Sequence, residues 1–109
     1  MGSTPTSIHL GQFTLDEAQA LVEKTFTIGI DGNEYQLKVI EASPIEVRAR
    51  RKSQLPKRPP FSVYFLGPRE PILPQGMYTL RNEATTLESL FIVPIGRDDE
   101  GTEYEAVFS

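Results

Sequence analysis

The sequence contains no cysteine and no tryptophan, and its single histidine is His9. Without cysteine the chain cannot form disulfides, thiolate metal sites or a cysteine nucleophile, and one histidine is too few for zinc sites with several imidazole ligands. No apolar run approaches the roughly 18 residues of a membrane-spanning helix, and the N-terminal region lacks the pattern of a secretory signal. We therefore expect a cytoplasmic protein with no metal, no cofactor, no catalytic residues and no membrane contact.

The length of 109 residues, with 39% hydrophobic and 24% charged residues, fits one globular domain with a core of its own. Little in the first twelve residues can pack against a core. We therefore predict a disordered leader over residues 1–12 and a single β-rich domain over residues 13–109.

A short helix is predicted directly after the leader. Thr14 and Glu17 have the spacing of a capping box, in which a hydroxyl and a carboxylate satisfy each other's backbone amides. Apolar residues follow at helical spacing, so the helix should extend from about Leu15 to Lys24 and bury one face.

From Thr25 onward the hydrophobic period changes to two, which is typical of strands. Asp31-Gly32 supplies a tight hairpin turn between strands at 25–30 and 35–39. Further strands are predicted over residues 61–66, 77–82, 89–95 and 103–108, with a connection over residues 96–101 before the last one. The expected fold is an antiparallel meander of about six strands that curls into a small barrel or sandwich, with the helix capping an open end.

Basic residues gather in one window. Residues 48–58 carry a charge of +6 without any acid, so the rest of a chain with a net charge of −4 carries −10. Such a loop can be a solvated surface, can dock on a protein, including an acidic neighbouring copy, or can grip phosphates. Nucleic acid is the least favoured of these partners because the window lacks the aromatic rings that stack on bases. The candidate contacts are Arg48, Arg50, Arg51, Lys52, Lys57 and Arg58.

The proline-rich stretch between Gly67 and Gly76 is the second candidate for partner binding. Stiff loops lose little entropy on binding, so they commonly present a recognition surface. The alternative is a stiff crossover between strands. Exposure of Ile72 and Leu73 would favour a partner.

Five acids between Asp98 and Glu105 allow a calcium hypothesis, but their spacing does not fit an EF-hand loop. A charged hairpin turn that keeps a sheet edge soluble explains them better.

Several segments together resemble a family of small bacterial domains of unknown function. These segments are Phe61-Ser62-Val63-Tyr64-Phe65-Leu66-Gly67-Pro68, Leu73-Pro74-Gln75-Gly76-Met77-Tyr78-Thr79-Leu80, Phe91-Ile92-Val93-Pro94-Ile95-Gly96 and Tyr104-Glu105-Ala106-Val107-Phe108. The resemblance extends over about residues 13–108, in a family of about one hundred residues whose members usually stand alone. It implies no assigned activity, and it suggests an association with phage-tail-like proteins.

Together these observations predict a non-enzymatic β-barrel module that acts by protein–protein interaction or self-association, as a structural or assembly component. The alternative is a module that binds an anionic ligand or nucleic acid through residues 48–58.

Overall fold

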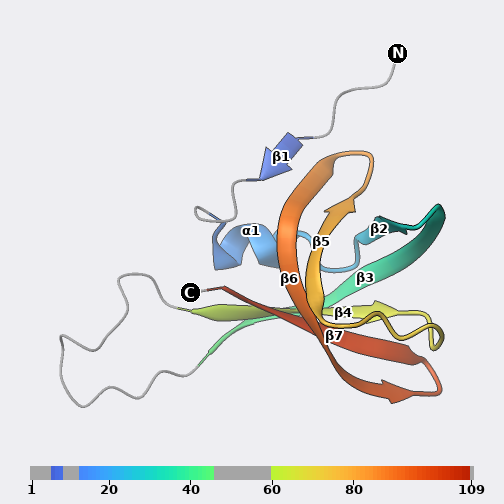
Figure 1. The fold of residues 1–109 in the computed structure, drawn as a ribbon. Coiled ribbons are helices and arrows are strands. Elements are labelled where there is room, and N and C mark those ends of the chain that lie inside the picture. The colour runs from blue at the N-terminus through green and yellow to red at the C-terminus, as the bar shows by residue number, and fades with distance from the viewer. Residues whose placement is uncertain (1–5, 9–12, 46–59, 109) are drawn as a thin grey trace.

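The structure is a computed structural model that describes residues 6–8, 13–45 and 60–108 (Figure 1). Strands dominate the described part, as predicted. The elements are β1 (Thr6–Ile8), α1 (Leu15–Ala20), β2 (Thr25–Ile30), β3 (Asn33–Pro44), β4 (Phe61–Gly67), β5 (Gly76–Arg81), β6 (Thr85–Asp98) and β7 (Gly101–Phe108).

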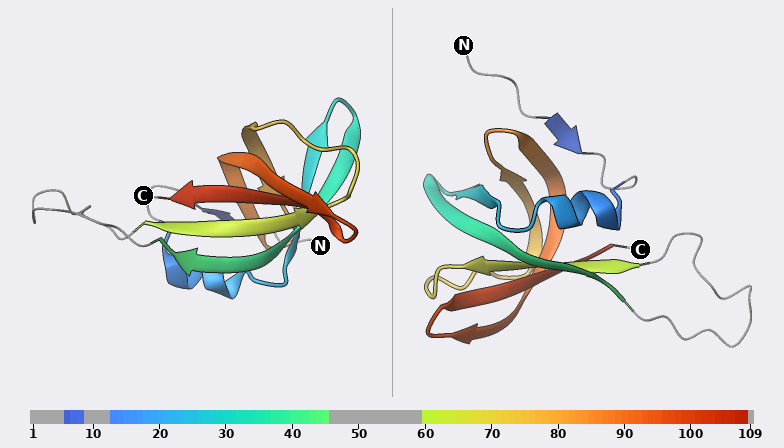
Figure 2. Two further views of the ribbon diagram at one scale, coloured as in Figure 1. Left: turned by 90° about the horizontal axis from the view of Figure 1, so that it is seen from below. Right: turned by 180° about the vertical axis from the view of Figure 1, so that it is seen from behind.

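Six antiparallel strands close into a ring, which confirms the predicted barrel. The order around the ring is β6-β5-β2-β3-β4-β7, and pairing between β6 and β7 closes it. The chain forms two three-stranded meanders, β2-β3-β4 and β5-β6-β7, rather than one continuous meander. The reason lies at β4, whose two edges are taken by β3 and β7, so the chain must cross to the opposite side of the ring to begin β5 (Figure 2).

The β2–β3 hairpin forms where the sequence predicts it. Asp31 and Gly32 both have positive φ values, 49° and 83°, as a two-residue type I′ turn requires. The long strand β3 then changes partner along its length. Its first half pairs with β2 and its second half with β4, and a bulge between Val39 and Glu41 bends the strand between them.

The two turns of the second meander are shorter than predicted. Residues 96–98 and 101 were expected in a loop, but they continue β6 and β7. Side-chain oxygens explain the tight turns. Asp98 Oδ1 accepts from the amides of Glu100 and Gly101 at 2.8 and 3.3 Å, and Asn82 Oδ1 accepts from those of Ala84 and Thr85 at 2.9 and 2.7 Å.

The capping box at Thr14 and Glu17 is present, but the helix ends at Ala20 rather than Lys24. The chain leaves the helix early because sheet pairing competes for its backbone. The Glu23 amide, at a φ of 78°, donates to the Val39 carbonyl at 2.8 Å, and the Val39 amide donates to the Lys24 carbonyl at 2.9 Å.

One end of the barrel is closed by aromatic rings. Phe13, directly before α1, lies 6.0 Å from Phe61 and 5.2 Å from Phe108, and the last two rings stack at 5.0 Å. These residues mark the end where β4 begins and β7 finishes, and α1 packs beside it on β3, with Gln19 Nε2 3.5 Å from the Ala42 carbonyl.

Part of the predicted leader belongs to the sheet. Thr6–Ile8 form β1, which pairs in parallel with Thr85–Leu87 of β6. β1 can pair with this stretch of β6 because β7 pairs only with β6 residues from Val93 onward and leaves the earlier edge to β1. The other residues of the predicted leader lie outside the described residues.

The interior of the ring is filled by side chains. The buried apolar residues are Phe13, Ala18, Phe26, Ile28, Leu37, Val39, Ala42, Phe61, Val63, Phe65, Leu73, Leu80, Leu87, Leu90, Ile92, Tyr104, Ala106 and Phe108. Because small barrels of this kind pack their interior with side chains, the surface available for binding is the outside and the rims.

Candidate functional site

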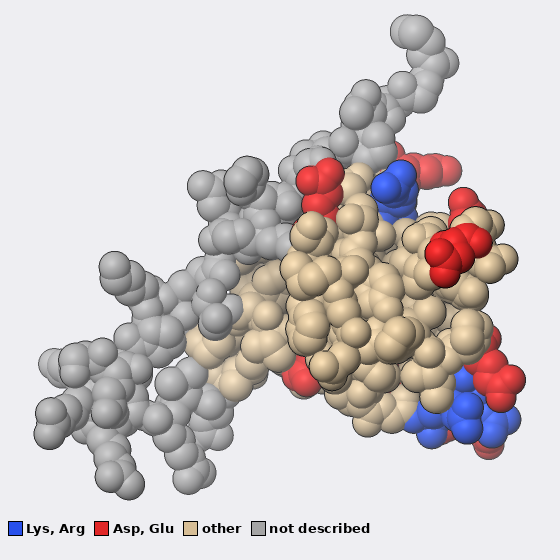
Figure 3. Space-filling model, in the orientation of Figure 1, with Lys and Arg blue, Asp and Glu red and all other residues tan. Residues whose placement is uncertain are grey.

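The outer face of β5 and β6 carries exposed apolar side chains. Met77 and Phe91 are partners in the β5–β6 register, and their exposed fractions are 62% and 47%. Half-buried Val93 and exposed Ile95 continue the row along β6. We call these four residues the apolar patch. Figure 3 shows an uncharged surface over β5 and β6, with charged residues at its edges.

The patch arises because both alternating sets of side chains on β6 are apolar. Leu90 and Ile92 point inward and are buried, whereas Phe91 and Val93 point outward. An antiparallel sheet with one solvated face usually places polar residues there. A contiguous exposed apolar surface of this kind is typical of a protein interaction site.

Sequence reasoning missed the patch. Residues 90–95 were interpreted only as a strand, although six consecutive residues without charge already signal a strand that needs cover on both faces. In the described part of the chain no second layer covers the outer side of Phe91, which is why its ring remains exposed.

The connection between β4 and β5, residues 68–75, closes the barrel end opposite the aromatic rings. Leu73 is buried, and its amide donates to the Tyr104 hydroxyl at 2.8 Å. The Tyr78 hydroxyl donates to the Pro74 carbonyl at 2.6 Å, and Thr102 Oγ1 donates to the Arg69 carbonyl at 3.2 Å. The connection is therefore an anchored crossover.

The two candidate contact residues of this connection differ in their exposure. Ile72 is 46% exposed and remains available to a partner, but Leu73 is 5% exposed and belongs to the core. Leu73 was a candidate partner contact only if exposed, and its burial removes it from that set, because the crossover places this side chain over the barrel interior.

The predicted basic contacts are not placed. Arg48, Arg50, Arg51, Lys52, Lys57 and Arg58 lie outside the described residues.

A polar cluster lies on the outer face of β4 and β7. Ser62 donates to Glu105 Oε2 at 2.7 Å, and Tyr64 is the register partner of Glu105. A hydrogen bond with Ser62 lowers the pKa of Tyr64, but desolvation and the charges of Glu105 and Glu41 outweigh it and raise this pKa overall. For Tyr78, beside the apolar patch, burial and the neighbouring Tyr104 raise the pKa.

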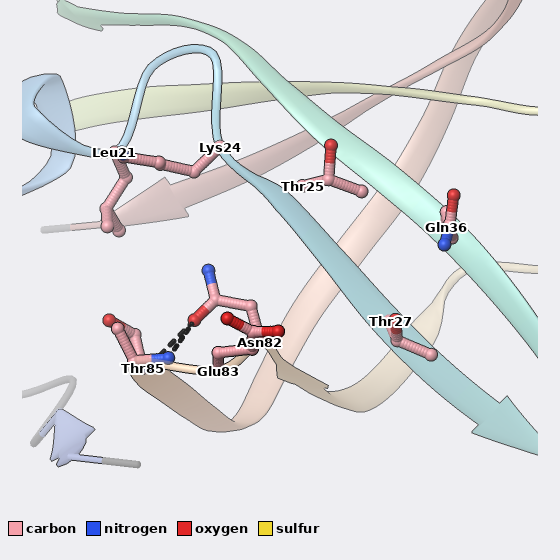
Figure 4. Close-up of a pocket in the computed structure, with 9 residues that line it drawn as sticks. Leu21, Lys24, Thr25, Thr27, Gln36, Asn82, Glu83 and Thr85 are labelled. Carbon is pink, nitrogen blue, oxygen red and sulfur yellow. Dashed lines mark hydrogen bonds between the residues drawn. The ribbon is translucent and has the colours of Figure 1, made fainter. Parts of the chain in front are cut away.

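An open pocket of about 470 Å³, lined by both polar and apolar side chains, lies between the start of β2 and the β5–β6 turn (Figure 4). Thr25, Thr27 and Gln36 line one side, and Asn82 and Glu83 line the other. Amide and hydroxyl groups of this kind can hydrogen-bond a small polar molecule. The side-chain oxygen Oδ1 of Asn82, however, already accepts hydrogen bonds from the turn amides of Ala84 and Thr85. The described residues contain no group of three or more acids or histidines placed to hold a metal ion. Within the same described ranges, no helix is long and apolar enough to span a bilayer.

Comparison with protein families gives one match. Residues 13–108 match a family described as a domain of unknown function (DUF6916). Searches of curated proteins and of solved structures each found no significant match.

Proposed function

Because the chain belongs to DUF6916, a family of domains of unknown function, and exposes an apolar patch on a barrel with a filled interior, we propose that it is a non-enzymatic module acting by protein–protein contact. The observation that supports this proposal most is the cross-strand pair Met77 and Phe91, exposed by 62% and 47% on an uncharged face. Methionine and aromatic residues are enriched in protein interfaces, and large aromatic side chains often dominate their energetics. Ile72 at the nearby barrel end is a second candidate contact.

We also propose, from the sequence resemblance, that the chain is a bacterial structural or assembly component associated with phage-tail-like proteins. We propose separately that it acts in the cytoplasm. The apolar patch on β5 and β6 is the surface through which such a component would bind its neighbour.

Photo-cross-linking in the native host tests the role of the patch. A photoreactive phenylalanine analogue at position 91 should capture a defined protein, whereas the same analogue at position 41 should not, because exposed Glu41 lies on β3 across the ring. Phe91→Ser should then weaken binding of the captured protein at least about tenfold, the loss of about 1.4 kcal/mol expected for a central aromatic contact. Equal capture at both positions, or none at position 91, would refute the proposal.

The alternative is an anionic ligand or a nucleic acid bound at residues 48–58, supported by their charge of +6. Binding of this kind weakens steeply with salt and is lost when Arg50, Arg51 and Lys52 are reversed to glutamate. A fluorescence anisotropy titration with a labelled oligonucleotide at low and high salt separates it from apolar contact, which depends little on salt.

A further inference from the structure

The seam between β2 and β5 is the weakest in the barrel. These two strands share a single register pair, Thr27 with Arg81, whereas β4 and β7 share seven. Beyond Thr27 the strands diverge, and a cavity of about 340 Å³ lies in the gap between them. Gly29 of β2 and Met77 and Thr79 of β5 line this gap.

Backbone hydrogen-bonding groups face the gap from both strands. Ile30 and Asn33 flank the two-residue turn and so exchange hydrogen bonds with each other, which by alternation directs the N–H and C=O of Gly29 away from β3. Directly after β5, the Asn82 amide donates to the Thr85 carbonyl of β6. By alternation, the backbone N–H and C=O groups of Arg81 and Thr79 point to the opposite side, toward β2. The next ladder pair would be Gly29 with Thr79, and it is not formed.

These unpaired edges specify an extended segment as the occupant. A free strand edge offers a row of donors and acceptors to an added strand, and side-chain sites on its two faces give specificity. Buried Ile28 and half-buried Tyr78 line the inner face of the gap.

The outer face of the gap is open, with acidic residues on the β3 side and the basic Arg81 on β5. An added Cβ on Gly29 would meet nothing within 4 Å, so side chains of an added strand have room there. Glu34, the register partner of Gly29, and Asp31 at the hairpin tip supply negative charge. On the side of Glu34 and Asp31, the complementary segment is therefore a strand in which apolar residues alternate with basic ones.

The chain contains such a segment. Val47 and Ala49 alternate with Arg48 and Arg50 in the sequence shortly after β3, which ends at Pro44. This segment cannot reach the gap of its own molecule. Residue 51 follows Ile45 by six positions, which extend to about 20 Å, whereas about 33 Å of strand separates Glu34 from Pro44 along β3. In Figure 1 the β2–β3 hairpin and the end of β3 lie on opposite sides of the molecule.

We propose that the gap between β2 and β5 binds residues 47–51 of a second copy of this chain as an added strand. The inference deepens the proposed function, on which it rests for the protein–protein mode of action, but its surface shares only Met77 with the apolar patch and does not include Phe91. Because donor segment and acceptor gap lie at opposite ends of β3, the contact is head-to-tail and propagates into an open chain of copies.

Sedimentation velocity of the full chain from about 1 to about 300 µM, a range that detects weak association, tests this proposal. The mass of the native chain should rise with concentration. Gly29→Pro removes the amide that faces the gap and should keep the protein monomeric, whereas Gly29→Ala, the matched control, should associate like the native chain. The donor variant Arg48→Glu/Arg50→Glu should also remain monomeric.

Mixing the two monomeric variants gives the sharpest result. Gly29→Pro retains its donor segment and Arg48→Glu/Arg50→Glu retains its gap, so an equimolar mixture should form dimers and nothing larger. Circular dichroism verifies the fold of each variant. If Gly29→Pro does not fold, Glu34→Lys replaces it as the acceptor variant, since it reverses the charge beside Gly29 without altering the backbone.

A native chain that stays monomeric throughout, association unaffected by the variants, or a mixture without dimers would each overturn the inference. Phe91→Ser distinguishes this failure from failure of the proposed function. It should leave self-association intact, and self-association lost with Phe91→Ser would assign the contact to the apolar patch instead.

Discussion

Replacing Leu73 by alanine should lower the free energy of unfolding by about 2–5 kcal/mol, the range measured for buried leucines. Leu73 enters the barrel from a connection that crosses the ring, and its amide is held by the buried Tyr104 hydroxyl at 2.8 Å. Truncation removes apolar contacts and leaves a cavity at the point where the crossover is anchored. Chemical denaturation followed by circular dichroism measures the change.

The neighbouring residue supplies a matched control. Ile72→Ala removes a similar apolar volume from a side chain that is 46% exposed, so its effect should remain within about 0.5 kcal/mol. Equal effects at positions 72 and 73 would show that the connection does not bury Leu73 as described.

Replacing Phe108 by alanine should have a comparable or larger effect, a loss of about 3–5 kcal/mol. Its ring stacks on Phe61 at 5.0 Å and meets Phe13 edge-on at 5.2 Å, so the substitution dismantles the aromatic closure of the barrel end. Aromatic pairs contribute beyond the area that they bury. The rings also connect the segment before α1 to β4 and β7.

Val107→Ala is the control, because Val107 lies next in sequence on the same strand and is 59% exposed. Its effect on thermal unfolding should be within a few degrees, whereas Phe108→Ala should lower the melting temperature by more than about 10 °C in a domain of this size. Similar melting temperatures for the two variants would mean that the aromatic closure does not hold the barrel end.

Local features of the fold followed from local sequence. The capping box at Thr14 and Glu17 and the Asp31-Gly32 turn were predicted correctly, because each depends only on residues within four positions of one another. Alternating hydrophobicity identified the strands for the same reason. Their ends were less predictable, since the length of β6 depends on its partners β5 and β7.

The candidate binding surfaces show the same difference between features that depend on local sequence and features that depend on distant strands. Exposure of Ile72 and burial of Leu73 could not be read from the sequence, because both are apolar neighbours in one stiff loop and only the crossing direction distinguishes them. The charge of residues 48–58 is visible in the sequence alone. The gap that we propose as the acceptor of residues 47–51 results from the divergence of β2 and β5, strands far apart along the chain.

The sequence by itself determined a strand-rich domain with one short capped helix, because side-chain periodicity and turn residues act over a few positions. Only the tertiary structure decided how the two meanders close, which apolar strand face remains uncovered and where two strand edges separate. These features depend on which distant strands become neighbours, and that choice is made by the packing of the whole core.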